Sequence, residues 1–155
     1  MAKIGMNLVM QIIGLDKAQS KLEKAKKEIQ NTKPLFDKAV IILEQSHAKT
    51  FRMGGRPKWK VSARASRQGG QTLIDTNRLQ QTLSATSPSS IREYKKDELK
   101  FGTKILYAPA HQFGYPAQGI PMRPFLGVYN EDIKRLEKVF EQDIEARLKV
   151  VNSVG

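Results

Sequence analysis

The sequence predicts an α+β fold built as a single domain over residues 1–155. Three observations lead to this prediction. Apolar residues alternate near the N-terminus, they recur at steps of three and four in longer segments, and short apolar runs between turn residues fill the centre. The 155 residues, 39% of them hydrophobic, suffice for one core and not for two. We expect an N-terminal strand and helical pair, a central antiparallel sheet with long loops, and a C-terminal amphipathic helix.

The N-terminal part of the chain changes its apolar period once. Residues 4–12 carry a large apolar side chain at every second position, which is typical of a half-buried strand. After Gly14 the apolar residues follow a helical stripe as far as Ile29. Pro34 cannot continue a helix from within but suits the first position of the next one. We therefore predict a second helix from Pro34 to His47, packed in the core or as a helical hairpin.

The segment that follows has neither helical nor strand periodicity. Residues 50–72 are glycine-rich, basic and poor in apolar residues. Long irregular loops in a small domain are usually functional, or they order on binding. We therefore predict a basic extended arm at about 50–72, with the aromatic residues Phe51 and Trp59 interleaved. Its cations are Arg52, Arg56, Lys58, Lys60, Arg64 and Arg67.

The central sheet is predicted from short apolar runs. Residues 72–83 suit a short helical turn or an extended stretch, with Asp75 and Thr76 as a plausible cap. Turn residues then separate three runs and favour a meander or hairpin. The three expected strands are residues 83–86, 91–94 and 99–101.

A proline- and glycine-rich stretch leads into the clearest helix of the chain. Asn130 is a good N-cap, and Glu131 and Asp132 suit the positive helix start. These two carboxylates, and those of Glu141 and Asp143, are expected on a solvated face. The apolar stripe of this helix comprises Ile133, Leu136, Phe140, Ile144 and Leu148.

Composition excludes several classes of function. The absence of cysteine rules out disulfides, thiol catalysis and cysteine-ligated metals, and the two histidines, His47 and His111, leave little for another metal site. No nucleophile elbow or phosphate-binding loop is present. No apolar run is long enough to span a bilayer, and no secretory signal is visible. We therefore expect no enzyme activity, no cofactor, no metal and no membrane partner; a small hydrolase acting through His111 is the weakest alternative.

The net charge of +12 is concentrated in the centre of the chain. Residues 49–104 carry 13 Lys and Arg against four Asp and Glu. This excess indicates an acidic partner, either nucleic acid or an acidic protein surface. No sequence-reading DNA-binding motif accompanies it, so only generic phosphate contact is expected. Phosphate contact and protein contact are equally favoured by the charge alone.

Several short motifs occur in a fixed order. They comprise Gly55-Arg56-Pro57-x-Trp59, Gly70, Leu73-x-Asp75-Thr76-x-Arg78-Leu79, Gly102-Thr103, Tyr107-Ala108, His111-Gln112-Phe113-Gly114 and Ile120-Pro121-x-Arg123-Pro124-Phe125-Leu126-Gly127. In this ordered set the chain resembles the phage virion morphogenesis family, the tail completion and head-to-tail joining proteins of tailed phages and Mu-like prophages. Two positions depart from the family pattern: Asn77 stands where glycine is frequent, and Met122 where a small residue is common.

The resemblance implies a structural protein of the virion, made in the host cytoplasm and built into the tail or neck. It implies a homo-oligomeric ring around the DNA passage, in contact with neighbouring neck, connector and tail proteins and, non-specifically, with packaged DNA. The basic arm would face a neighbouring subunit or DNA. A free, sequence-independent nucleic-acid-binding protein is the alternative. The expected assembly or loop anchors are Trp59, Asp75, Arg78, Tyr107, His111, Phe113, Arg123 and Phe125.

Overall fold

The α+β prediction is confirmed by the computed structural model, which describes residues 8–12, 31–84 and 86–153. The predicted helix up to Ile29 and the first residues of the predicted strand lie outside these ranges. The described elements are β1 (Leu8–Ile12), α2 (Lys33–Met53), α3 (Ala63–Gln68), α4 (Arg78–Gln81), β2 (Ser90–Tyr94), β3 (Leu99–Thr103), α5 (Ala108–Phe113), the 3-10 turn η1 (Pro116–Gln118) and α6 (Asn130–Ser153).

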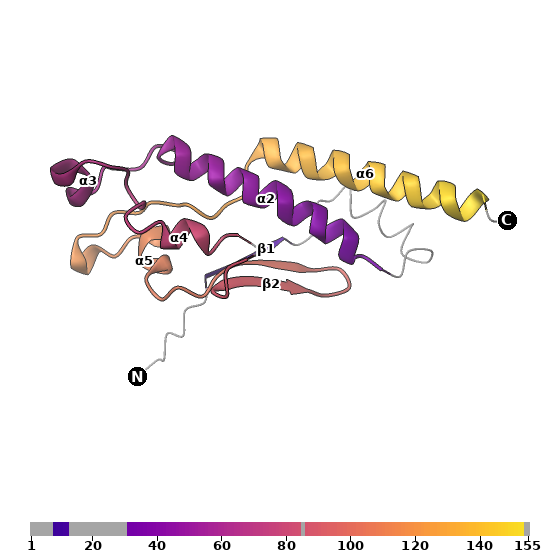
Figure 1. The fold of residues 1–155 in the computed structure, drawn as a ribbon, viewed down its shortest axis with the longest axis horizontal. Helices are drawn as coiled ribbons and strands as arrows, with labels where there is room; N and C mark the ends of the chain where they lie inside the picture. Colours follow the sequence, from indigo (N-terminus) through magenta and orange to yellow (C-terminus); the bar gives the residue numbers. More distant parts are fainter. Residues whose placement is uncertain (1–7, 13–30, 85, 154–155) are drawn as a thin grey trace.

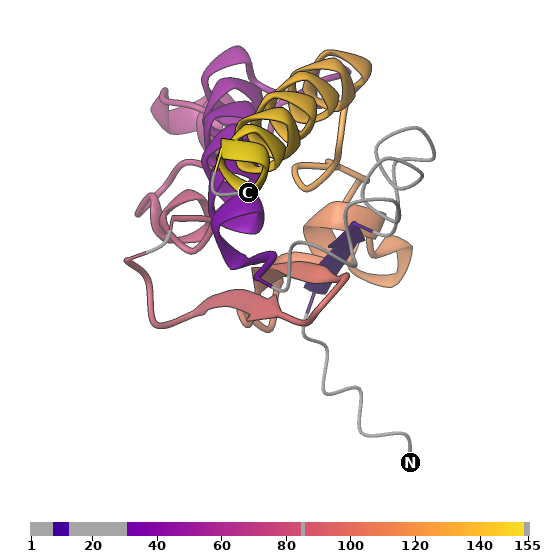
Figure 2. The ribbon, with the colours of Figure 1, turned by 90° about the vertical axis from the view of Figure 1, so that its right-hand side faces the viewer.

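The two long helices lie on one side of a small sheet. Figures 1 and 2 show α2 and α6 side by side above the strands. The strand order is β1-β3-β2, and both pairings are antiparallel. Leu99 of β3 pairs with Ile12 on one side and with Tyr94 on the other. The predicted hairpin is confirmed, and the N-terminal strand adds to its free edge.

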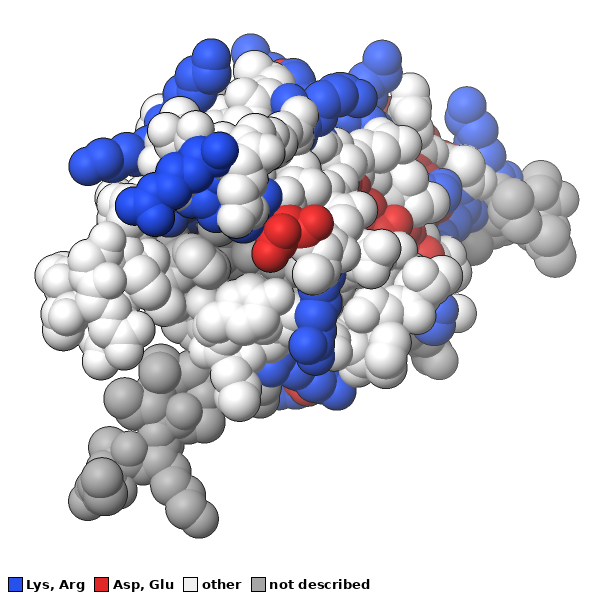
Figure 3. Space-filling view, turned by 60° about the vertical axis from the view of Figure 1, so that its left-hand side comes forward, with Lys and Arg blue, Asp and Glu red and all other residues white. Residues whose placement is uncertain are grey.

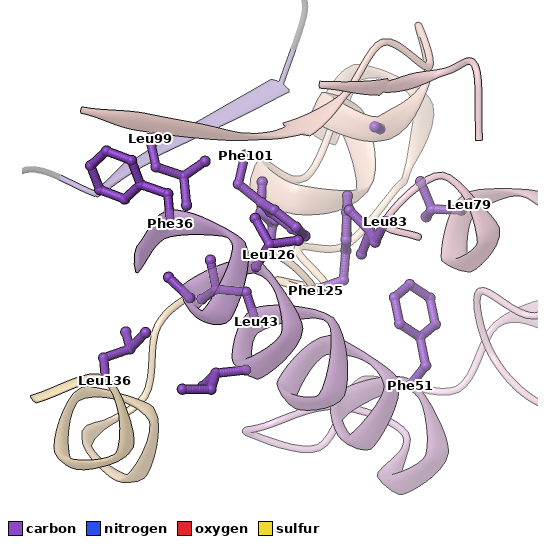
Figure 4. Packing of buried hydrophobic residues seen from close by; sticks show 14 of the residues in the cluster. Phe36, Leu43, Phe51, Leu79, Leu83, Leu99, Phe101, Phe125, Leu126 and Leu136 are labelled. Atoms are coloured by element: carbon purple, nitrogen blue, oxygen red, sulfur yellow. The ribbon is translucent and has the colours of Figure 1, made fainter. Parts of the chain in front are cut away.

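The core lies between the sheet and α2. Leu99 and Phe101 of β3 face Phe36 and Leu43 of α2, as Figure 4 shows. Leu136 of α6 belongs to the same cluster and is 1% exposed. Burying one such side chain stabilises the fold by about 1.5–3 kcal/mol. The helical stripes of α2 and α6 and the alternation of β3 therefore converge on one cluster.

Helix α2 is longer than predicted. It extends beyond His47 to Met53, because Thr50 and Phe51 are buried on its core face. Gly54 ends it with a φ of 72°, and its N–H donates to the carbonyl of Phe51. Glycine adopts this left-handed conformation without a side-chain penalty.

Two local predictions around α4 are wrong. Leu83 and Ser84 form turns that follow α4 instead of a strand, and their N–H groups donate to carbonyls within that helix. The N-cap of α4 is Asn77, with a φ of 59°, not Asp75 or Thr76. Its left-handed backbone explains why asparagine can replace glycine there.

The N-cap of α6 is also displaced from the prediction by one residue. The carbonyl of Tyr129, not that of Asn130, accepts the first helical hydrogen bonds, from Asp132 N at 2.9 Å and Ile133 N at 3.0 Å. The Asp132 carboxylate returns this contact by accepting from Tyr129 N at 3.0 Å. This reciprocal arrangement satisfies donors that a helix start leaves unpaired.

Candidate functional site

The prediction of an extended arm over residues 50–72 is wrong. Its first residues belong to α2, a tight turn through the cis Arg56–Pro57 bond follows, and residues 63–68 form helix α3. Ser62 caps α3 by accepting a hydrogen bond from Ala65 N. Figure 1 shows α3 at the end of the molecule opposite the C-terminus. The segment is a folded protrusion, so its cations have defined positions.

Trp59 holds this protrusion against the body of the protein. Its side chain is 6% exposed and packs edge-on against Phe51, with ring centroids 5.3 Å apart. Its indole N–H donates to the carbonyl of Pro124 at 2.8 Å. Its backbone N–H donates to the carbonyl of Gly54 at 2.8 Å. Trp59 thus joins the end of α2 to a segment 65 residues away in sequence.

Arg56 lies inside the protein's own contact network and not on a free basic surface. Its Nε donates to Thr50 Oγ1 at 2.9 Å, and its Nη2 donates to the carbonyl of Ser46 at 2.7 Å. The guanidinium stacks 3.7 Å above the ring of Tyr129 and pairs with Glu131. Arg56 therefore links α2 to the start of α6, and it is the arm cation least suited to contact DNA.

The two segments on either side of η1 are bound to each other. Arg123 N donates to the carbonyl of His111 at 2.7 Å. The side chain of Gln112 accepts hydrogen bonds from the backbone N–H groups of Phe125 and Leu126 and donates to the Leu126 carbonyl. Phe125 is fully buried and contacts Phe51, with ring centroids 5.9 Å apart. Two of the motifs quoted for the resemblance, residues 111–114 and 120–127, thus contact each other.

Comparison with known proteins shows the family of the chain. The sequence model of the phage virion morphogenesis family matches residues 13–145 of the chain. The chain belongs to this family. It is 32% identical over 118 residues to Mu-like prophage FluMu G protein 2 of Haemophilus influenzae, an alignment that covers 73% of this chain and 78% of the relative. No solved structure matches the chain.

Membership in the phage virion morphogenesis family gives the chain a role in building the virion. The functional surface of such a protein is the set of faces that contact its neighbours. Two features at the α3 end have the character of such a surface: a cationic cavity, and a group of exposed basic and apolar side chains.

The cavity lies between the start of α3, the segment before α4, and α5. We call it the Arg123 pocket, and its volume is about 270 Å³. It gathers five of the predicted anchor residues and one predicted arm cation. Its lining comprises Ser62, Arg64, Leu73, Asp75, Thr76, Asn77, Arg78, Leu79, Tyr107, His111 and Arg123.

The charge of the Arg123 pocket is positive. Arg123 is 6% exposed, and its Nε donates to the carbonyl of Lys60 at 2.9 Å. Arg64 donates to the carbonyls of Gln71 and Ile74, and its Nε lies 3.6 Å from Asp75. Arg78 is exposed at the N-terminus of α4. Three guanidinium groups and one carboxylate therefore line the cavity.

His111 adds a neutral group to the pocket. Burial, and next the charge of Arg123, hold the pKa of His111 below its usual value. Its ring meets that of Tyr107 edge-on at 5.9 Å, and its Nδ1 is buried without a hydrogen-bond partner.

Phe113 is not an anchor of its own loop. Its side chain is 66% exposed, whereas Gln112 beside it makes the contacts that hold the loop. Sequence reasoning missed Gln112, although it lies inside the motif from His111 to Gly114. The sequence also predicts Asp132 and Asp143 on a solvated face. This prediction is wrong, because the two residues are buried and only 1% and 8% exposed.

Those buried carboxylates tie the two long helices together. Asp132 accepts a hydrogen bond from Ser46 Oγ at 2.6 Å. Asp143 pairs with Lys38 at 2.5 Å and with Arg147 at 2.7 Å. Both link α6 to α2, which explains why acidic residues on the core side of α6 are tolerated.

The other arm cations remain on the surface. Arg52, Lys58, Lys60 and Arg67 are exposed, and among the described residues none of these four forms an ion pair. Figure 3, turned so that the α3 end comes forward, shows Lys and Arg side chains gathered on the upper part of this face. The described segments contain no group of three or more metal-ligating side chains. None of their helices is long and apolar enough to cross a bilayer.

Proposed function

We propose that this protein completes the tail or joins head to tail in a tailed phage, as a homo-oligomeric ring at the neck around the DNA passage. Its family membership and its similarity to a Mu-like prophage G protein support a structural role in the particle rather than catalysis. The finer placement at the neck is our inference from the resemblance and from the surface of the folded chain.

The observation that carries this proposal is the apolar surface between α5 and the segment before Arg123. Large apolar side chains there are strongly exposed: Leu106 at 80%, Tyr107 at 42%, Phe113 at 66%, Tyr115 at 45% and Met122 at 63%. An exposed group of this kind usually marks a protein interface. The loop that carries it is fixed by Gln112 and Arg123, so the surface is rigid before it binds. Preorganised loops lower the entropic cost of association.

The exposed cations of the α3 end suit a position beside DNA or beside an acidic subunit. In a ring, one face of each protomer contacts a different face of the next, and closure leaves a lumen. Lysine and arginine side chains toward that lumen would meet phosphates without reading sequence.

Electron microscopy of virions is the direct test. We expect density for this protein, identified by a fused tag, as a ring between capsid and tail. Particles lacking the gene should accumulate as separate heads and tails, and the intact gene supplied in trans should restore joined particles. Density in the capsid shell or the baseplate would refute the neck assignment.

The exposed cations also favour a second candidate, a sequence-independent nucleic-acid-binding protein. This candidate predicts that the isolated protein binds duplex DNA with an affinity that falls steeply with salt, by about one log unit per log unit of salt for each phosphate contacted. Substituting Arg67 and Lys58 with Gln should reduce that slope. Absence of measurable binding by the isolated protein at low salt would eliminate this candidate and leave the virion assembly role.

A further inference from the structure

We propose that the Arg123 pocket is a receptor for a carboxylate side chain on a neighbouring protein that is not a second copy of this chain. The proposal deepens the assembly function and rests on it, because it names the chemistry of one contact within the particle. A phage protein placed elsewhere in the virion could still use the pocket. The neck assignment and the pocket proposal can therefore each be refuted without the other.

The Arg123 side chain is charged and buried. Its side chain is more than nine-tenths buried, yet no carboxylate among the described residues pairs with it. A buried guanidinium is costly unless an anion or several hydrogen bonds compensate it. Lys60 supplies one carbonyl, to Nε alone. The cavity that Arg123 lines is therefore where a compensating anion belongs.

Two further arginines, one carboxylate and a histidine ring line the pocket with Arg123. Arg78 is an exposed cation at the same cavity, without an ion-pair partner among the residues described. Arg64 is partly neutralised by Asp75, which is itself largely exposed. His111 adds a buried ring nitrogen without a partner. Two guanidinium groups, those of Arg123 and Arg78, are thus available to form charge-assisted hydrogen bonds to a single carboxylate.

The shape of the pocket suits a side chain from a neighbouring protein. The pocket is a hollow of about 270 Å³ whose walls include Leu73, Leu79 and the ring of Tyr107. An acidic side chain carried on a neighbouring chain can enter such a hollow and pack its methylene groups against these walls. A DNA duplex is a rod with phosphates along its outer surface, and it contacts broad basic faces more readily than a hollow with partly apolar walls.

The charge of the chain favours a different protein as the partner. The chain carries a formal charge of +12, so an acidic neighbour complements the pocket better than a second copy of the chain does. Many of its carboxylates are already paired internally, among them Asp37, Glu44, Glu131 and Asp143. An acidic neighbour offers the carboxylate without breaking these pairs.

The test is a titration of the isotope-labelled full chain, followed by NMR. The probes are the peptide acetyl-Leu-Glu-Leu-amide, the matched peptide with Gln in place of Glu, and a short DNA duplex. We expect saturable shifts at Arg78, His111 and Arg123 with the Glu peptide, and binding at least about fivefold weaker with the Gln peptide, because a neutral amide forms no charge-assisted hydrogen bonds with the two guanidinium groups.

Variants separate the pocket from general charge. Arg78→Gln should weaken binding of the Glu peptide at least about threefold, whereas Arg67→Gln, an exposed cation outside the pocket, should leave it unchanged. The Arg78 side chain is exposed and forms no hydrogen bond or ion pair with any described residue, so this variant stays informative if Arg123→Gln fails to fold.

Several outcomes would overturn the proposal. These are no saturable shifts at the pocket, equal binding of the Glu and Gln peptides, or equal effects of Arg78→Gln and Arg67→Gln. Stronger shifts at the pocket with duplex DNA than with peptide would reassign the site to phosphate. Dimers in sedimentation that Arg78→Gln abolishes would reassign it to a second copy. None of these results bears on whether microscopy finds the protein at the neck.

Discussion

Lowering the pH should destabilise the fold through His47, in the middle of the core. Its ring is 1% exposed and stacks on Phe101, with centroids 5.2 Å apart. Its Nε2 lies 3.1 Å from the carbonyl oxygen of Gly127. Burial lowers the pKa of His47 from 6.5 to about 4. The folded protein therefore keeps this ring neutral at pH values where the unfolded chain protonates it.

The sign and size follow from that difference. Between the two pKa values the unfolded state binds the extra proton, so stability is fully present above pH 6.5 and falls as the pH drops toward 4. At about 1.4 kcal/mol per pKa unit, His47 accounts for a loss of about 2.5 kcal/mol between pH 7.5 and pH 4.5. This is a large share of the stability of a typical domain.

Urea denaturation of the untagged wild type and of His47→Gln at both pH values measures the effect. The variant should be less stable at pH 7.5, yet it should lose about 2.5 kcal/mol less than the wild type on acidification. The chain has only two histidines, so an NMR titration resolves both rings. Equal losses in wild type and variant, or titration of His47 near 6.5, would refute the reasoning.

Three further predictions concern packing and backbone. Phe125→Ala should lower the free energy of unfolding by about 3–5 kcal/mol, because the ring is fully buried; a loss under about 1 kcal/mol in urea melts would show that its site collapses freely. Gly55→Ala places a Cβ 2.5 Å from Trp59 Cδ1 at a φ of +107°, whereas the matched Gly54→Ala meets nothing within 4 Å. The first should cost at least about 2 kcal/mol more than the second, and equal thermal midpoints would contradict this. Asp132→Ala should cost about 1–3 kcal/mol, because the Ser46 hydroxyl and the Tyr129 N–H both lose the carboxylate oxygen that accepts them; unchanged denaturation would count against the cap.

The parts of the fold that sequence predicts well depend on local signals. The β2–β3 hairpin and α6 follow from alternation, turn residues and a helical stripe within a few residues of each other. The sequence predicts the end of α2 too early, because glycines and cations follow His47 closely. Only the buried contacts of Thr50 and Phe51 with distant segments show that the helix continues.

The site shows the same division. The basic segment indicates Arg64 and the motifs indicate Asp75, His111 and Arg123, but nothing in the spacing of these residues shows that they line one cavity. Arg56 and Lys58 look alike in sequence, although only Arg56 is taken up by Glu131 and Tyr129. Whether a cation is free or paired is decided by tertiary contacts, which a motif does not record.

In the strand order β1-β3-β2, the N-terminal strand prevents β3 from pairing with other molecules. β3 is the central strand only because β1, from the N-terminal part of the chain, covers one of its edges. A truncation or a bulky N-terminal fusion that prevents β1 from pairing turns β3 into an open edge with unpaired N–H and C=O groups. Such an edge accepts a strand from another molecule. Deletion of Leu8–Ile12 should therefore lead to aggregation or strand exchange.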